Sequence, residues 1–220
     1  MTEKKDKTAL KVPGVTGVGV SSTGVEAMKT AGGQGTFYGG LEVTADIKDQ
    51  LTKQNVIVTD SMNIESFSAD SFTVDSASAL CTLTGAADVT ITAPVTVSSA
   101  AAFTMGTNTL EVTGAVTMNA DLEITAASTK FDSTVNGGND LTVNGNADFE
   151  DTVGGTTAVE DLTVTGAGSF KKAVTAAGDL HVTGAATFGA NVTAANILLE
   201  EYPERKIEIW IPRMLTCMHL

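Results

Sequence analysis

Two pairs of adjacent carboxylates are the residues of this sequence best suited to chemistry. Glu150 is followed by Asp151, and Glu160 is followed by Asp161. Hydrolysis of a glycosidic bond uses two carboxyl groups about 5 to 9.5 Å apart. Adjacent residues of a strand point to opposite faces, however, and the surrounding repeats contain no Trp or Tyr on which a sugar ring could stack. We therefore interpret both pairs as solvated charges at turns.

The histidines and cysteines are too few and too scattered for a catalytic centre. His181 and His219 have no partner at the spacing of a metal site or a catalytic triad. Cys81 takes a position that Leu occupies in other repeats, which predicts a buried apolar thiol. Cys217 has no His or Asn context for a nucleophile. We expect no catalytic residue, no metal ligand and no cofactor.

The glycine-rich stretches predict turns. Residues 137–140, Gly-Gly-Asn-Asp, are similar to the calcium-binding repeat of β-rolls, but the motif occurs once and lacks the third Gly. A turn before a strand explains this stretch better. No phosphate-binding or dinucleotide-binding glycine pattern follows a strand and opens a helix.

Composition and charge argue against several classes of function. The 220 residues include 13 Lys and Arg against 26 Asp and Glu, a net charge of −13, which argues against binding to nucleic acid. No apolar run of about 18 residues predicts a transmembrane helix, and the charged residues 1–11 lack the apolar core of a secretory signal peptide. The chain is 42% hydrophobic but only 5% aromatic, which suits a thin, repetitive core better than a compact enzyme core.

Three repeats in the second half of the chain define its architecture. The unit is L-x-V-[T/N]-G-x-[A/G]-x-F-x-x-x-V, and its copies span residues 141–153, 162–174 and 180–192. The conserved letters of the unit fall at even offsets, and alternate residues of an extended chain share one face. This parity predicts a structural core formed by Leu141, Val143, Phe149, Val153, Leu162, Val164, Phe170, Val174, Leu180, Val182, Phe188 and Val192.

A glycine at offset 4 marks a bend, a bulge or the close approach of another backbone. Weaker copies of the unit begin at Leu41, Cys81, Leu110 and Leu122, and the last of these has its Phe shifted by one residue. The predicted bends are at Gly85, Gly114, Gly145, Gly166 and Gly184.

The predicted fold is all-β, an elongated repetitive shaft of short strands. Phe131, Phe149, Phe170 and Phe188 recur at intervals of 18, 21 and 18 residues, so stacked coils would place them above one another about 4.8 Å apart. The shaft is either a single-chain β-solenoid or a β-prism-like structure of three chains around an axis. We expect a homotrimer, because one chain has few large residues and three chains would cover its thin core.

The ends of the chain differ from the shaft. We predict an irregular, Gly-rich N-terminal arm with an anchoring role over residues 1–40, the shaft over 41–195, and a C-terminal cap or docking segment over 196–220. Segments 45–53 and 194–201 are the candidates for short helices. Residues 54–200 contain 17 acidic residues and three Lys, whereas the first 30 residues are slightly basic, so we expect the arm to dock and the shaft to project. The candidate docking residues are Tyr202, Ile207, Ile209, Trp210 and Ile211.

Units of this form resemble the β-rich shafts of bacteriophage tail fibres, tailspikes and capsid-decoration spikes. The match rests on residues 141–153, 162–174 and 180–192, with weaker copies back to Cys81, and covers about half of the chain. Similar runs occur in bacterial adhesins and other β-solenoids. The resemblance implies an elongated, usually trimeric virion protein that is fixed to the particle at one end. It carries over no catalytic residue, because the matched motif is structural.

The sequence therefore predicts a non-enzymatic virion structural protein, a fibre, spike or capsid-decoration component that gives mechanical stability and surface display. It would be assembled in the host cytoplasm, with capsid or tail proteins as partners and host surface glycans as further candidates. Nucleic acid and a membrane span are not expected. The alternatives are a cell-surface adhesin or scaffold with the same shaft, and a glycan-binding or glycan-cleaving tailspike.

Overall fold

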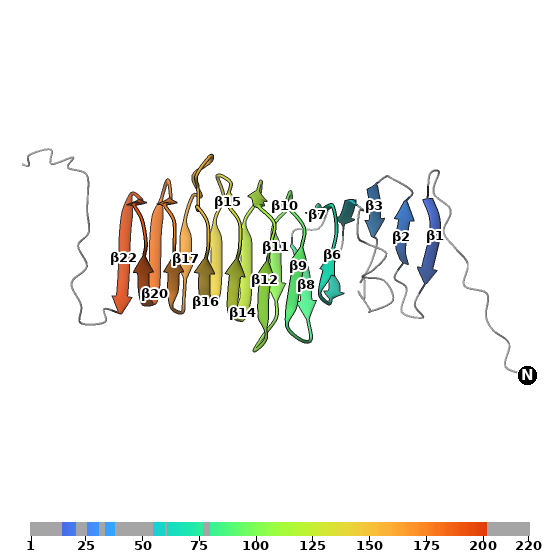
Figure 1. The fold of residues 1–220 in the computed structure, drawn as a ribbon, viewed down its shortest axis with the longest axis horizontal. Coiled ribbons are helices and arrows are strands. Elements are labelled where there is room, and N and C mark those ends of the chain that lie inside the picture. The colour runs from blue at the N-terminus through green and yellow to red at the C-terminus, as the bar shows by residue number, and fades with distance from the viewer. Residues whose placement is uncertain are drawn as a thin grey trace, which may run out of the picture.

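The chain folds into strands that stack along one axis. The structure, a computed structural model, describes residues 15–20, 26–30, 34–37, 55–59, 61–76 and 80–201. These residues contain strands, turns and bends and no helix. Their strands form a β-solenoid of about seven coils (Figure 1). This confirms the predicted all-β repetitive fold, and the single-chain solenoid is the alternative that the structure shows.

Each coil contains three strand positions, which we name after the residues that they turn inward. The leucine side is formed by the first halves of the long strands and by the short strands aligned with them. Its strands are β5 (Met62–Ile64), β8 (Cys81–Gly85), β11 (Ala101–Thr104), β14 (Leu122–Phe131), β16 (Leu141–Phe149), β17 (Leu162–Val164), β20 (Asp179–Phe188) and β22 (Asn196–Glu201).

The phenylalanine side follows in each coil and belongs to the same twelve-stranded sheet. It consists of the second halves of β14, β16 and β20 together with β6 (Phe67–Ser68), β9 (Val89–Thr92), β12 (Thr109–Val112) and β18 (Gly168–Phe170).

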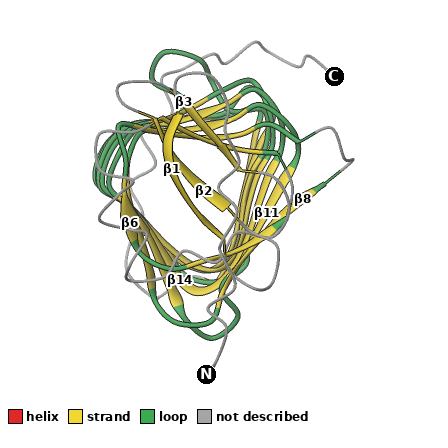
Figure 2. Cartoon of the chain, turned by 90° about the vertical axis from the view of Figure 1, so that its right-hand side faces the viewer, coloured by secondary structure: helices red, strands yellow, loops and turns green. Residues whose placement is uncertain are grey.

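The valine side closes the coil, as the view along the axis shows (Figure 2). Isolated bridges at Val153 connect its six-stranded sheet to the pair of strands that follows. Its strands are β3 (Gln34–Phe37), β4 (Asn55–Val58), β7 (Ser71–Val74), β10 (Val95–Val97), β13 (Val116–Met118), β15 (Val135–Asn136), β19 (Val174–Thr175) and β21 (Val192–Thr193).

The strands pair in parallel throughout the solenoid, because each coil returns the chain to the same edge in the same direction. On the leucine side, Leu141 is aligned with Leu162, and Leu162 is aligned with Leu180. The one antiparallel pair in the described part of the chain joins β1 (Val15–Val20) to β2 (Glu26–Thr30). Alternating burial along the strands follows from the two-residue period of extended chain.

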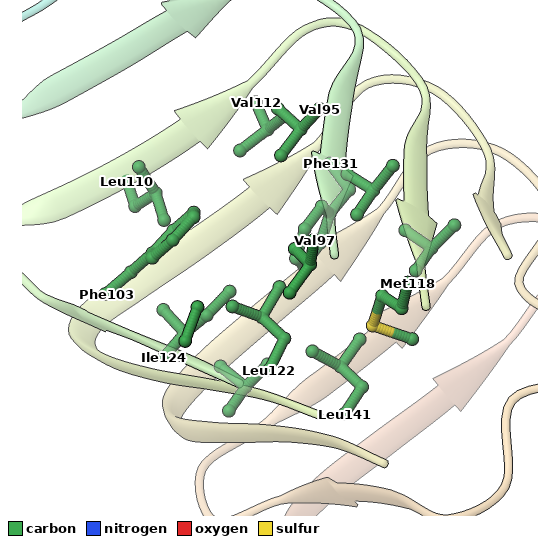
Figure 3. Packing of buried hydrophobic residues seen from close by; sticks show 14 of the residues in the cluster. Val95, Val97, Phe103, Leu110, Val112, Met118, Leu122, Ile124, Phe131 and Leu141 are labelled. Atoms are coloured by element: carbon green, nitrogen blue, oxygen red, sulfur yellow. The ribbon is translucent and has the colours of Figure 1, made fainter. Parts of the chain in front are cut away.

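The core is a set of ladders that run along the axis. Phe131, Phe149, Phe170 and Phe188 are stacked with ring centroids 4.9, 5.0 and 5.0 Å apart and interplanar angles of 9°, 7° and 12°, as the spacing of the repeats predicts. Figure 3 shows how side chains of the three sides meet in the interior, with Phe103, Leu110 and Val97 as examples. Dispersion contacts and the removal of apolar area from water stabilise this arrangement coil by coil.

Most of the predicted core residues lie in these ladders. Phe188 and Val192 are only half-buried, because no described strand covers them on the far side. The buried ones are Leu141, Val143, Phe149, Val153, Leu162, Val164, Phe170, Val174, Leu180 and Val182.

Three predictions about the organisation are wrong or lie outside the described residues. The copy of the unit beginning at Leu110 is out of register, since Leu110 pairs with Val89 and Thr129 on the phenylalanine side; Ala101 takes the Leu position. Because Ala101 is not a Leu, the pattern of the unit does not identify this position. The copy that begins at Leu41 and the candidate helix over 45–53 lie outside the described residues.

The boundaries of the shaft are wider than predicted. Segment 196–201, predicted as the start of the cap and as part of a short helix, is strand β22 and pairs in parallel with β20. The free edge of β20 offers backbone groups that a local helix would leave unpaired. At the other end, β3 pairs in parallel with β4, so regular structure begins within the predicted irregular arm. Glycine lacks a side chain, but its backbone still pairs in a sheet.

The core of one chain does not need further chains to cover it, contrary to the premise from which we expected a trimer. The ladders are buried by the three sides of the same chain, from Val56 at one end to Val182 at the other. Association of copies therefore has to be argued from the outer surface.

Candidate functional site

The outward side chains form columns along the stack, and the candidate carboxylates belong to these columns. Glu150 pairs with the ammonium of Lys171, and Oδ1 of Asp151 accepts a hydrogen bond from the N–H of Thr152 at 2.7 Å in the turn that follows. Glu160 is exposed. The fourth carboxylate, that of Asp161, accepts a hydrogen bond from the N–H of Asp179. Three of the four carboxylates thus have structural contacts, and Glu160 is a surface charge.

Four aspartates form a column at the corner where each coil enters the leucine side. The N–H of Asp140 donates to Oδ1 of Asp121 at 3.1 Å. The N–H of Asp161 donates to Oδ1 of Asp140 at 3.1 Å, and the N–H of Asp179 donates to Oδ1 of Asp161 at 2.7 Å. Nδ2 of Asn196 continues the column by donating to Oδ1 of Asp179 at 2.7 Å. Each carboxylate therefore fixes the start of the next strand.

Two lysines connect the carboxylates of the phenylalanine side. Nζ of Lys130 lies 3.1 Å from Oε1 of Glu111 and 2.6 Å from Oδ1 of Asp132. The hydrogen bonds to Asp132 and Glu111 raise the pKa of Lys130 above its ordinary value, and the hydrogen bond to Glu150 does the same to the pKa of Lys171. Because these groups are exposed, solvent screens their attraction, and the pairs mainly align neighbouring coils.

The predicted bends form a second kind of column. Three of them, Gly145, Gly166 and Gly184, lie above one another between the leucine and phenylalanine sides. The N–H of Gly166 donates to the carbonyl oxygen of Gly145, and the N–H of Gly184 donates to that of Gly166, with N to O distances of 2.9 and 3.0 Å. A Cβ on Gly166 or Gly184 would lie 2.6 Å from the backbone of the coil below. These glycines therefore allow the close approach of two backbones.

The other two predicted bends make room in different ways. A Cβ on Gly85 would lie 2.4 Å from Sδ of Met105, so this glycine accommodates a large buried side chain. Gly114 lies between β12 and β13, at another corner of the coil, where a Cβ would lie 2.1 Å from the carbonyl oxygen of Ala93.

The remaining candidates for chemistry also have structural positions. Cys81 is buried at the start of β8, aligned with Ala101. Nε2 of His181 lies 2.9 Å from Oε1 of Glu200, a contact between β20 and β22 at the surface. In the glycine-rich stretch, Nδ2 of Asn139 donates to the carbonyl oxygen of Met118 at 2.9 Å. The turn that we predicted there is thus bonded to the coil below.

The described residues contain no group of three or more His, Cys, Asp or Glu side chains that could hold a metal ion. His219, Cys217 and the candidate docking residues Tyr202, Ile207, Ile209, Trp210 and Ile211 lie outside the residues that the structure describes.

Comparisons with protein-family models, with curated proteins and with solved structures find no match to this chain. No helix in the described part of the chain is long and apolar enough to cross a membrane.

The repeats contained one signal that sequence reasoning missed. An Asp precedes the first Leu of the three clear repeats and of the copy that begins at Leu122, at Asp121, Asp140, Asp161 and Asp179. A unit defined from its apolar positions starts one residue too late to include it. The column of aspartates could have been found by extending the alignment of the repeats by one residue.

Proposed function

We propose that this chain is a non-enzymatic structural protein of a virion, the rigid shaft of a fibre, spike or capsid-decoration component. The observation that carries the non-enzymatic part is the use of the outward carboxylates. The column Asp121, Asp140, Asp161 and Asp179 and the ion pairs of Lys130 and Lys171 connect one coil to the next. Polar groups committed to such contacts stabilise a stack and leave few of them to act on a substrate.

The virion part of the proposal is supported by two features. The repeat unit resembles those of bacteriophage shafts, and a solenoid with continuous ladders has the stiffness that projection from a particle requires. The partners would be capsid or tail proteins, and further copies of this chain as a homotrimer. Host surface glycans are a candidate ligand of the assembled particle.

Particle purification tests the virion part. Particles from cells that contain this gene are banded by density, and their proteins are quantified by mass spectrometry. We expect the chain to remain with the particles after a high-salt wash, at a fixed copy number relative to the major shell protein. Its presence only in the cell envelope fraction would favour the adhesin alternative and contradict a virion location.

A reducing-end assay tests the non-enzymatic part. The purified chain is incubated with host surface polysaccharide at 1 to 10 μM protein, on the order of typical assay concentrations, with a commercial glycosidase as the positive control. We expect no new reducing ends. Release of oligosaccharides that is lost in an E160Q variant would instead support the glycan-cleaving tailspike.

A further inference from the structure

The valine side carries no charge over most of the solenoid. We define the neutral strip as residues 93–99, 114–120, 133–138, 152–159, 173–178 and 190–195, which are its strands with their flanking residues from β10 to β21. None of these residues is Asp, Glu, Lys, Arg or His, although residues 54–200 contain 17 acidic residues and three lysines. The pairings of β10, β13 and β15, the bridges of Val153 and the pairing of β19 with β21 place the segments one above another.

The strip presents small polar side chains. Thr96 is aligned with Thr117, and Thr117 is aligned with Asn136. Thr175 is aligned with Thr193 further along the axis. All five are half-buried or exposed on the outside of the coil. Threonine loses little conformational freedom when such a surface is covered, because its χ1 angle is already restricted in a strand.

The other two sides do not share this property. The phenylalanine side turns Glu111, Lys130, Asp132, Asp148 and Glu150 outward, and its ion pairs occupy them. The leucine side carries exposed Glu123 and Glu200, and the column of aspartates runs along its edge. Only the valine side, within the described chain, is free of charge over six successive coils.

We propose that the neutral strip is the surface through which copies of this chain pack side by side. Two chains with a net charge of −13 repel each other. Contact through the strip brings no carboxylate of one copy opposite a carboxylate of the other, whereas the other two sides both carry outward carboxylates. Depletion of charged residues is the compositional signature of the centre of a protein interface.

The area of the strip indicates how strongly two copies should associate. Six coils at about 4.8 Å and about five residues per coil at 3.3 Å cover roughly 30 by 17 Å, or about 500 Å² per copy. Two such faces bury about 1,000 Å², the lower limit for a specific interface. Association is therefore expected in the micromolar range. The inference rests on the proposed association of copies and is independent of a virion location.

Sedimentation velocity of the full chain from 1 to 100 μM, roughly the range in which such an interface associates, tests the strip. The wild-type chain is expected to shift from its monomer mass of 22.5 kDa to an oligomer. The double variant Thr96→Glu/Thr175→Glu places two charges four coils apart on the strip and should weaken association at least tenfold. The matched control Thr82→Glu/Thr163→Glu makes the same change at outward, half-buried threonines four coils apart on the leucine side. It should associate as the wild type does.

A measurement at high salt shows whether the strip variant fails to associate because of charge repulsion or because it misfolds. In 0.5 M NaCl the strip variant should recover most of its association, because screening removes the repulsion between the introduced carboxylates, and circular dichroism should be the same for all three proteins. A wild-type chain that stays monomeric at 100 μM, roughly the upper end of the expected range, would overturn both the strip and the association of copies. An oligomer that the strip variant leaves intact, or that the control weakens equally, would overturn the strip alone.

Discussion

Gly145 is the residue at which the stack leaves least room for a side chain. Its φ is 145°, and a Cβ at this position would lie 1.8 Å from the carbonyl oxygen of Ala126 in the coil below. Gly145→Ala combines an unfavourable backbone conformation with a clash, so we expect a loss of at least about 2 kcal/mol in the free energy of unfolding. Urea denaturation measures it.

Gly138 provides the control at the same scale. A Cβ built on Gly138 meets nothing within 4 Å. Gly138→Ala should therefore change the stability by less than about 1 kcal/mol, and the reduced freedom of the unfolded chain favours a small gain. Equal losses for the two variants would show that the structure does not depend on the close approach at Gly145.

Thr129 is a polar residue in an apolar ladder. Its side chain is completely buried between Leu110 and Ala147, and its hydroxyl has no hydrogen-bond partner. Val has the same shape without the hydroxyl, so Thr129→Val should raise the free energy of unfolding by about 1 to 2 kcal/mol. The same change at the outward Thr163 should stay within about 0.5 kcal/mol. A destabilised Thr129→Val would mean that the hydroxyl is bonded in solution.

At the scale of elements, the Phe stack ties the coils together from β14 to β20. Phe149 is buried and stacked on both faces, by Phe131 and by Phe170, whereas Phe188 is half-buried and stacked on one. Phe149→Ala should cost about 3 to 5 kcal/mol, as large-to-small changes in a packed core do.

Phe188→Ala is the matched comparison at the end of the stack. It should cost less than about half as much, since the ring is only partly buried and is stacked on one face alone. Thermal unfolding followed by far-ultraviolet circular dichroism measures both variants. Equal losses would imply that residues beyond β22 cover Phe188 as fully as the coils cover Phe149.

The strands of the second half were predictable because parity is a property of each unit. Alternation in 141–153 alone indicates which side chains turn inward, and the return of Phe once per unit, at intervals of 18, 21 and 18 residues, indicates that these rings stack. The same logic located the extra residue after Leu122. It is accommodated by a bulge between Thr125 and Ser128, which brings Phe131 back into register with Phe149.

Register between distant coils was not predictable in the same way. Leu110 begins a sequence that matches the unit, yet it lies on the phenylalanine side. The length of the turn before Leu110 decides on which side of the coil this residue lies. The sequence of that turn, Met-Gly-Thr-Asn, does not indicate which side follows it. The surface columns were missed for a related reason, because they join residues about 20 positions apart whose side chains are ordinary polar groups when considered one at a time.

At the scale of the whole molecule, the distribution of charge over the surface determines which side can contact another copy, and the total charge alone does not. Carboxylates are concentrated at the corner that leads into the leucine side and on the phenylalanine side, and they are absent from the neutral strip. The outer surface is therefore acidic on the leucine and phenylalanine sides and uncharged along the neutral strip. This arrangement is the one that the proposed packing through the neutral strip requires, because carboxylates at a contact between two acidic chains would repel each other.

The column of aspartates predicts how the whole stack responds to salt. Asp140 lies between Asp121 and Asp161, so three carboxylates follow one another in neighbouring coils. Asp140→Asn keeps an oxygen that can accept the N–H of Asp161, and its new amide can donate to Asp121 as Nδ2 of Asn196 donates to Asp179. The substitution removes repulsion on both sides, and we expect a gain of about 0.5 to 1 kcal/mol at low ionic strength.

The dependence on salt shows whether the gain in stability of Asp140→Asn comes from repulsion within the column or from the lower net charge of the chain. The gain should shrink as NaCl is raised toward 1 M, where the Debye length is about 3 Å. Asp75→Asn removes one charge directly after Val74, whose partners Val58 and Val97 are followed by the uncharged Thr59 and Ser98. The stability of this variant should therefore change little at any salt concentration. If both variants respond to salt alike, net charge governs the stack. If only Asp140→Asn responds, the carboxylates that set the coils in register also limit how stable a longer stack of the same repeats could become.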